Sequence, residues 1–309
     1  MIETKGLTRH FGETVAVEDL TVHVKKGEVF GFLGPNGAGK TTTIRMLCCL
    51  ISKTKGEAYI DGLNTSDEKD ALKIRQIVGL LPEATGLYER LSAYRNLDFY
   101  CKLYGLPKRR REENIERFLR MLNLWERRKE PVAKFSKGMR QKIAIARALI
   151  HDPKVVFLDE PTASLDPEAS KTVRDFILNL KKEKCTIFLN THNLDEADRI
   201  CDRIGIINTK LITVDSPNAL KRKLWKPRTA IHLERLNSNL VASVEKLSTV
   251  KKVETSKNTI ICEVENPEKE NPIIVEAIVK AGGKIQYVTS LYRSLEDVYL
   301  KLVKETPES

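Results

Sequence analysis

A glycine-rich loop is the sequence feature that most constrains what this chain can fold into. The run Gly34–Thr41 reads Gly-Pro-Asn-Gly-Ala-Gly-Lys-Thr and fits the pattern G-x-x-x-x-G-K-[ST]. It follows Val29–Leu33, an apolar run without helical period that is typical of a buried strand, and a helical stretch from Lys40 to about Leu50 follows it. An ordinary glycine-rich turn is the alternative, but the flanking strand and helix favour a phosphate-binding loop in an α/β fold.

The residue types of this loop suit the phosphates of a nucleotide. Glycines let the backbone curl so that successive N–H groups point at one phosphate chain, and the helix N-terminus adds partial positive charge. We expect Lys40 to contact the β- and γ-phosphates and the Thr41 hydroxyl to bind Mg²⁺. The predicted phosphate-contacting residues are Gly34, Pro35, Asn36, Gly37, Ala38, Gly39, Lys40, Thr41 and Thr42.

Two carboxylates follow a second buried strand, Val155–Leu158. Open α/β sheets bind their ligands at the carboxyl ends of the strands, which is where Asp159 and Glu160 would lie. We expect Asp159 to hold Mg²⁺ through water and Glu160 to take the proton from the water that attacks the γ-phosphate. Acidic helix capping is the alternative interpretation, and the phosphate-binding loop argues against it.

Strands and helices alternate as far as about residue 215, which predicts a parallel sheet covered on both faces. Ser216-Pro217 is a typical helix start, and Lys221–Arg228 is interpreted as a basic connector. The remaining pattern has the order β-α-β-β-α-β, which predicts a small ferredoxin-like domain. A last helix is expected to begin at Ser294, where Asp297 forms a partial capping box.

The net charge of +11 allows several kinds of partner. Nucleic acid is one interpretation, anionic lipid or phosphate is another, and a solvated basic surface is the third. The basic run Lys108–Arg111 precedes three glutamates and so resembles a helix start of mixed sign, and no nucleic-acid-binding motif accompanies the charge. We therefore expect no nucleic-acid partner.

The apolar runs and the cysteines further limit the class of protein that this chain can be. No run approaches the roughly 20 apolar residues needed to cross a bilayer. The N-terminus lacks the apolar core of a signal peptide, so we expect a cytoplasmic chain. The six cysteines form no C-x-x-C pair and are interpreted as buried or free thiols.

The run from Phe135 to Pro167 resembles the signature-to-Walker-B block of ABC-type ATPases. The resemblance covers roughly residues 2–215 and implies an ABC ATPase fold in 1–215, with a helical subdomain at about 84–150, a linker at 216–228 and an accessory domain at 229–309. It also implies ATP and Mg²⁺ as cofactors. Two copies would pair head to tail, with each ATP between the phosphate loop of one copy and the signature of the other.

The signature departs from the family's usual Leu-Ser-Gly-Gly-Gln, because phenylalanine, lysine and methionine stand at its first, third and fifth positions. Ser136 and Gly138 remain, and they supply a hydroxyl and an unobstructed N–H at a helix N-terminus. By the resemblance, both contact the γ-phosphate of the partner's ATP, and Lys137 adds favourable charge.

Three further positions take roles from the resemblance. His192 matches the histidine that bonds the γ-phosphate and positions Glu160, although a lone histidine is more often structural. Asp166 matches the loop that crosses the dimer interface. Phe11 matches an aromatic that stacks on adenine, and a core or surface aromatic is its alternative.

Glu83 stands where most ABC ATPases carry a glutamine that touches Mg²⁺ or its water. Its Pro-Glu context, and the segment Ser294–Leu302, resemble the drug-resistance and sodium-export branch of the family. The C-terminal extension is interpreted either as a dimerisation or regulatory element or as a packed appendage.

The predicted function is therefore the ATP-hydrolysing subunit of an ABC transporter, at the cytoplasmic face of the membrane. A separate integral membrane permease would insert a short helix in a groove near Glu83–Tyr100, and the resemblance favours export. A soluble ABC ATPase acting on nucleic acid or ribosomes is the alternative, which the single cassette and the missing coiled coil disfavour. A nucleotide-sensing module without catalysis is disfavoured by the intact Lys40, Asp159, Glu160 and His192.

Overall fold

The computed structural model describes residues 1–163, 165–224, 227–291 and 294–305, and these form two compact units. Unit 1 contains Met1–Pro217 and the end of the last helix from Leu302, and unit 2 contains Asn218–Lys301. The boundary falls inside helix α8 (Pro217–Leu224). The predicted helix start at Pro217 is therefore observed, whereas the first half of the predicted basic connector is helical rather than irregular.

Unit 1 alternates strands and helices after two long N-terminal strands. Its elements are β1 (Ile2–Phe11), β2 (Thr14–Val24), β3 (Val29–Leu33), α1 (Lys40–Leu47), β4 (Lys55–Ile60), β5 (Leu63–Asn64), α2 (Glu68–Ile77), β6 (Val78–Leu81), α3 (Ala93–Leu103), α4 (Lys108–Met121), α5 (Lys137–Leu149), β7 (Val155–Asp159), α6 (Pro167–Lys182), β8 (Thr186–Asn190), α7 (Leu194–Ile200), β9 (Arg203–Asn208) and β10 (Lys210–Asp215). Two short 3₁₀ turns, Trp125–Arg127 and Val132–Lys134, lie between α4 and α5.

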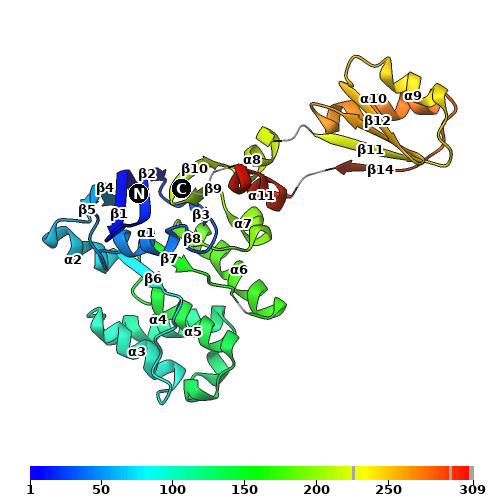
Figure 1. Cartoon of the computed structure of the whole chain (residues 1–309). Helices are drawn as coiled ribbons and strands as arrows, with labels where there is room; N and C mark the ends of the chain where they lie inside the picture. The colour runs from blue at the N-terminus through cyan, green and yellow to red at the C-terminus, as the bar shows by residue number, and fades with distance from the viewer. Residues whose placement is uncertain (164, 225–226, 292–293, 306–309) are drawn as a thin grey trace. The chain divides into compact units, whose positions relative to one another are not determined.

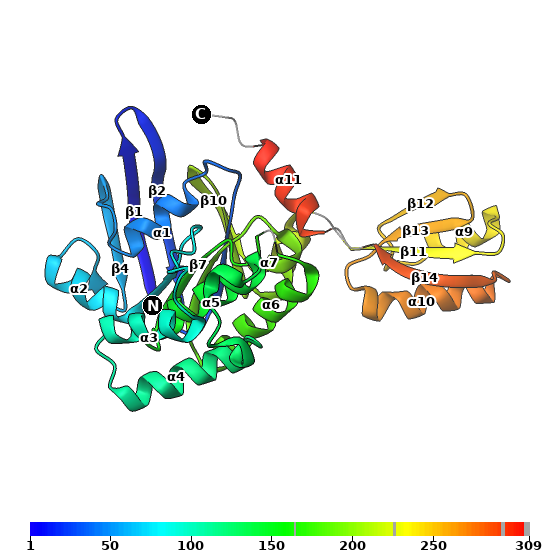
Figure 2. The ribbon, with the colours of Figure 1, turned by 90° about the horizontal axis from the view of Figure 1, so that it is seen from below.

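The larger sheet of unit 1 has the strand order β10-β9-β3-β8-β7-β6, with parallel neighbours from β9 to β6 and an antiparallel β10. Every residue of β3, β7 and β8 is buried, as expected for strands covered on both faces. Helices α5, α6 and α7 gather along one side of this sheet (Figure 2). The predicted parallel sheet is thus present, and β10 adds an antiparallel edge.

A second sheet, which the sequence analysis did not predict, has the antiparallel order β2-β1-β4-β5. Its apolar side chains share one core with α1 and with the facing side of the parallel sheet. Four phenylalanines form the centre of the contact, and the Phe188 ring lies 5.1 to 5.5 Å from those of Phe30, Phe32 and Phe157. This core fixes the phosphate-binding loop between the two sheets, because β3 leads into the loop and α1 leaves it.

Helices α3, α4 and α5 gather at one end of unit 1 (Figure 1). Ser92 caps α3 by accepting a hydrogen bond from Arg95 N, at 3.2 Å. Helix α4 begins at the predicted basic run, and Arg109 pairs with Glu113 one turn later, at 2.8 Å. The mixed charges of this segment therefore stabilise its own helix.

Unit 2 has the predicted order of elements: β11 (Arg228–Leu233), α9 (Ser238–Glu245), β12 (Lys252–Ser256), β13 (Thr259–Glu263), α10 (Pro267–Lys280) and β14 (Ile285–Leu291), followed by α11 (Leu295–Glu305). Its antiparallel sheet has the order β12-β13-β11-β14, and α9 and α10 share one core with it. This is the ferredoxin-like arrangement, so that prediction is confirmed. At α11, Ser294 N donates to Asp297 Oδ2 at 3.0 Å and Asp297 N donates to Ser294 Oγ at 3.2 Å, which is a reciprocal capping box.

Replacing Phe188 with alanine tests the shared core of unit 1. The cavity left among three other rings should lower the free energy of unfolding by about 3–5 kcal/mol, measured by urea denaturation. Leu72→Ala on α2 is the control, since Leu72 is 61% exposed and its loss should cost no more than about 0.5 kcal/mol. Equal losses for the two variants would contradict the assignment of this core.

Candidate active site

The phosphate-binding loop joins β3 to α1 in a conformation that only glycine adopts without strain. Gly37 and Gly39 have φ of 84° and 90°. A Cβ added to Gly39 would lie 2.2 Å from the carbonyl oxygen of Ala16 on β2, so another residue would also collide with the neighbouring sheet. No side chain caps the N-terminus of α1, which leaves its first N–H groups to bind an anion.

The Lys40 side chain folds back over this loop. Its Nζ donates to the carbonyl oxygens of Gly34 and Pro35, both at 2.8 Å. Burial lowers the pKa of Lys40, and the nearby Glu160 and Asp159 carboxylates oppose that shift. A buried ammonium held at the loop suits the binding of phosphate charge, as predicted for this residue.

Two of the three predicted metal-binding residues, Thr41 and Asp159, are in contact. Thr41 Oγ1 donates to Asp159 Oδ2 at 3.0 Å, and Asn190 Nδ2 makes a close hydrogen bond to Asp159 Oδ1. Asn190 is opposite Asp159 in the pairing of β8 with β7. A hydroxyl and a carboxylate are hard oxygen donors, and this donor set fits Mg²⁺.

Glu160 has a backbone conformation that is unusual for its residue type. Its φ is +51°, and its N–H donates to the carbonyl oxygen of Asn190 at 2.9 Å. A left-handed residue other than glycine costs on the order of 1 kcal/mol, and such residues cluster at functional sites. His192 Nδ1 lies 2.8 Å from Glu160 Oε2, so the predicted base and the predicted histidine are in contact.

Ser136, Gly138 and Asp166 form a second group at the start of helices α5 and α6. Ser136 Oγ accepts from Met139 N at 3.2 Å, and Asp166 Oδ1 accepts from Ala169 N at 2.8 Å, so both are N-caps. A Cβ on Gly138 would lie 3.9 Å from Asp166 Oδ2, which places the two helix starts side by side. Among the described residues, no hydrogen bond joins this group to the phosphate-binding loop.

The last two predicted residues lie at the surface. Phe11 ends β1, is 47% exposed, and has the Arg9 guanidinium 4.4 Å from its ring centroid, so it is no core residue. Glu83 is exposed, two residues beyond β6, whose Leu81 pairs with Leu158 of β7. The pairing brings the Glu83 segment beside the strand that ends in Asp159. Its contact with a metal stays a prediction.

Two functional candidates, Asn190 and Glu196, were missed by the sequence analysis. Asn190 is the last residue of β8. The available signal was that it follows the apolar run Thr186–Leu189, just as Asp159 follows the apolar run Val155–Leu158. Glu196 is buried in the first turn of α7 and accepts from the hydroxyls of Thr162 and Thr191. Nothing in the local sequence distinguishes it from an acidic helix start.

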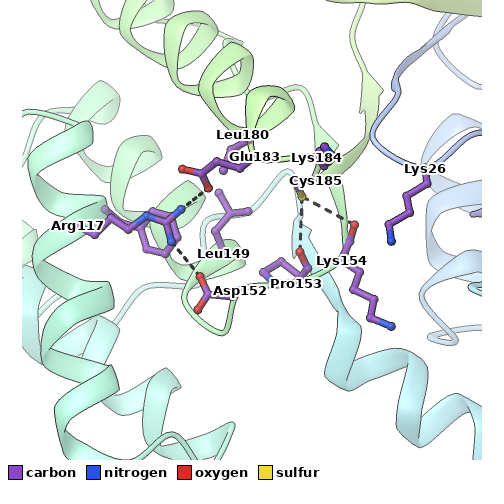
Figure 3. A pocket seen from close by; sticks show the side chains of 11 residues that line it. Lys26, Arg117, Leu149, Asp152, Pro153, Lys154, Leu180, Glu183, Lys184 and Cys185 are labelled. Atoms are coloured by element: carbon purple, nitrogen blue, oxygen red, sulfur yellow. Dashed lines mark hydrogen bonds and ion pairs between the residues drawn. The ribbon is translucent and has the colours of Figure 1, made fainter.

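A cavity of about 380 Å³ lies at the opposite edge of the sheet, before β7 and β8 begin (Figure 3). Arg117 crosses it, pairing with Asp152 at 3.1 Å and closely with Glu183. None of the described residues that line it belongs to the phosphate-contacting set. The cavity is therefore separate from the candidate active site.

A second cavity, of about 300 Å³, lies between β6, the segment after α1, and the helices α2, α3 and α5. We call it the α3 groove; it is lined by Cys48, Leu50, Arg75, Val78, Leu80, Tyr100, Tyr104, Arg147 and Ala148. Arg147 Nη1 donates to the carbonyl oxygen of Thr85 at 2.7 Å. Tyr100 Oη donates to the carbonyl oxygen of Gly86 at 3.1 Å. The segment that follows Glu83 is thus attached to the wall of this groove.

No helix among the described residues is both long and apolar enough to cross a membrane.

Comparisons with known proteins agree with this geometry. Residues 17–163 match the family described as ABC transporter, and residues 216–303 match the domain described as ATP-binding protein DrrA1-3-like, C-terminal domain. The bacitracin transport ATP-binding protein BcrA of Bacillus licheniformis is 35% identical, over 98% of this chain and 97% of that protein. The uncharacterized ABC transporter ATP-binding protein YhcH of Bacillus subtilis is 33% identical, over 100% of this chain and 97% of that protein.

Solved structures show the same fold. A structure of an ATP binding subunit of an ABC transporter is 31% identical with a TM-score of 0.67, covering 72% of this chain and 93% of that one. A dimeric ATP-binding cassette in a post-hydrolysis state with ADP and Pi is 26% identical with a TM-score of 0.64, covering 70% of this chain and 98% of that one. The chain therefore belongs to the ATP-binding proteins of ABC transporters, a family of ATP hydrolases.

Proposed function

We propose that two copies of this chain clamp Mg-ATP head to tail, and that closure of this dimer drives export through a separate integral membrane permease. The observation that carries the proposal is that the predicted site residues form two groups on one chain, with no hydrogen bond between the groups among the described residues. The phosphate-binding loop with Glu160 and His192 forms one half, and Ser136, Gly138 and Asp166 form the other. A second copy would supply the missing half to each nucleotide.

In this proposal the phosphate-binding half performs the chemistry. Lys40 and the N–H groups of α1 bind the β- and γ-phosphates, and Phe11 stacks on the adenine. Thr41 and Asp159 would hold Mg²⁺, Glu83 would accept a hydrogen bond from its water, and the metal would supply positive charge beside the phosphates. In this arrangement Lys40, the N–H groups and the metal would offset the phosphate charge, and the carboxylates would act through the metal.

Glu160 is the proposed general base. Its Oε2 accepts the proton of the attacking water, and His192 orients the carboxylate through the 2.8 Å contact of Nδ1 with Oε2. The other ring nitrogen of His192 would lie toward the γ-phosphate, so that the ring links the base to the phosphate it acts on. The left-handed backbone of Glu160 keeps the carboxylate in this arrangement at a cost that the hydrogen bond to Asn190 helps to offset.

The signature half would bind the partner's nucleotide. Ser136 and Gly138 begin α5, where a hydroxyl and free N–H groups meet the positive end of the helix dipole. Lys137 adds a charge at the same helix start, and Asp166 would cross the dimer interface. After hydrolysis the separated phosphate no longer bridges the halves, and the dimer opens.

The α3 groove is the proposed docking site for a short helix of the permease. Exposed apolar side chains line it, notably Leu50 and Tyr104, which are 54% and 41% exposed. Such a patch suits an amphipathic partner helix. The hydrogen bonds from Arg147 and Tyr100 would connect the groove to the Glu83 segment and so to the metal side of the active site.

The similar proteins support a transporter over the nucleic-acid alternative. One is named for bacitracin transport and another, LnrL of Bacillus subtilis, for linearmycin resistance, which favours export as the direction. The chain would then lie at the cytoplasmic face of the membrane, bound to its permease.

Replacing Lys40 with alanine tests the phosphate-binding role. Loss of a charge-assisted contact should weaken ATP binding by about 100-fold or more, measured by fluorescence titration with Mg-ATP. Lys69→Ala, on the exposed side of α2, is the matched control and should bind as the wild type does. Unchanged affinity in Lys40→Ala would contradict the role.

Replacing Glu160 with glutamine tests the general base. The amide cannot take the proton of water, so phosphate release should fall by about 100-fold or more while ATP still binds. The trapped nucleotide should hold two chains together, which sedimentation with saturating Mg-ATP would detect. Exposed Glu168→Gln is the control, and full hydrolysis by Glu160→Gln would refute the assignment.

A further inference from the structure

Glu196 is a buried carboxylate that the proposed chemistry does not use. It is the third residue of α7 and only 2% exposed. Its N–H donates to the Asn193 side chain at 3.0 Å, an N-cap hydrogen bond that fixes the start of the helix. The backbone of Glu196 is therefore fixed, and its side chain lies in a buried place where a carboxylate is costly unless it is hydrogen-bonded.

One oxygen of Glu196 joins two segments of the active site. Oε2 accepts from Thr162 Oγ1 at 2.8 Å and from Thr191 Oγ1 at 3.2 Å. Thr162 is two residues beyond Glu160, and Thr191 directly precedes His192. Both threonine side chains are buried, so water does not compete for these bonds as it would at the surface.

The other oxygen, Oε1, is buried without a hydrogen-bond partner among the described residues. Burial raises the pKa of Glu196, as the physical cost of placing charge there requires. A partly satisfied carboxylate contributes little to stability, because an apolar residue of similar volume often packs as well or better. Such local costs are typical of functional sites.

We infer that Glu196 is a positioning residue that keeps the Glu160 segment and the His192 segment in register. The inference rests on the proposed roles of Glu160 and His192. Their 2.8 Å contact is made by residues on separate loops, and the Thr162–Glu196–Thr191 bridge is a buried link between those loops. The phosphate-binding loop has its own support in β3, α1 and Gly39, so Glu196 affects hydrolysis and not ATP affinity.

The first test separates turnover from binding. Glu196→Ala should lower kcat by about tenfold, because small misplacements of catalytic groups are costly, and should leave the KM for ATP within about twofold. Glu196→Gln keeps a carbonyl oxygen that accepts from both threonines and should restore kcat to within about threefold of wild type. A wild-type kcat in Glu196→Ala, or equal loss in the glutamine variant, would overturn the inference.

A second test asks whether Glu196 acts through His192. In a His192→Ala background the bridge no longer has a histidine to position, so adding Glu196→Ala should change phosphate release by less than about twofold. A further tenfold loss would indicate general destabilisation and contradict the inference. The Thr191→Val variant removes one arm of the bridge and should lie between wild type and Glu196→Ala, which gives a milder variant if Glu196→Ala folds poorly.

Failure of the Glu196 inference can be told apart from failure of the proposed function. Full hydrolysis by Glu160→Gln and His192→Ala would remove the basis of the proposed chemistry itself. If hydrolysis falls strongly but measurably in those variants and Glu196→Ala hydrolyses ATP as the wild type does, only the role of Glu196 fails.

Discussion

The pairing of β7 with β8 is the constraint on which the site depends. It places Asn190 opposite Asp159, where the amide bonds the carboxylate and the Asn190 carbonyl accepts from Glu160 N. A one-residue slip would turn every side chain of a strand to the other face, so the buried apolar residues of both strands fix this register. The chemistry at the sheet's carboxyl edge thus rests on packing in its centre.

The phosphate-binding half and the signature half of the site are both built at helix N-termini. Each lies where the chain enters a helix, at α1 for the phosphate-binding half and at α5 and α6 for the signature half. The difference is in the caps: Ser136 and Asp166 satisfy N–H groups with their own side chains, whereas α1 has no side-chain cap. Its unsatisfied N–H groups give the phosphate-binding half the stronger attraction for an anion.

The sequence predicted the parts of the site that are contiguous in the chain. The loop Gly34–Thr41 and the pair Asp159-Glu160 are readable because strand, glycines and helix follow one another. The order of elements in unit 2 was readable for the same reason. The roles of the individual residues remain predictions, since no ligand contact tests them.

Features set by long-range pairing were not readable. The contact of Asn190 with Asp159 depends on the register of β8 against β7. The link from Glu196 to Thr162 depends on the packing of α7, which leaves no local pattern. The antiparallel sheet of β1, β2, β4 and β5 was missed because its strands are half-exposed and because β1 pairs with β4, which lies far along the chain. The sequence indicated a helix start at Ser216-Pro217 and a basic connector after it, but not that the helix continues through Lys221–Leu224.

The central claim is that neither chain alone completes a site, and mixing two inactive variants tests it most directly. Lys40→Ala disables the phosphate-binding half, and Gly138→Asp sets a carboxylate against the partner's phosphate in the signature half. A mixed pair still contains one intact site, made from the signature of the first variant and the phosphate-binding loop of the second. The account predicts that neither variant alone releases phosphate and that phosphate release returns when the two are mixed. It would be contradicted if Gly138→Asp hydrolysed ATP normally by itself, or if the mixture stayed inactive.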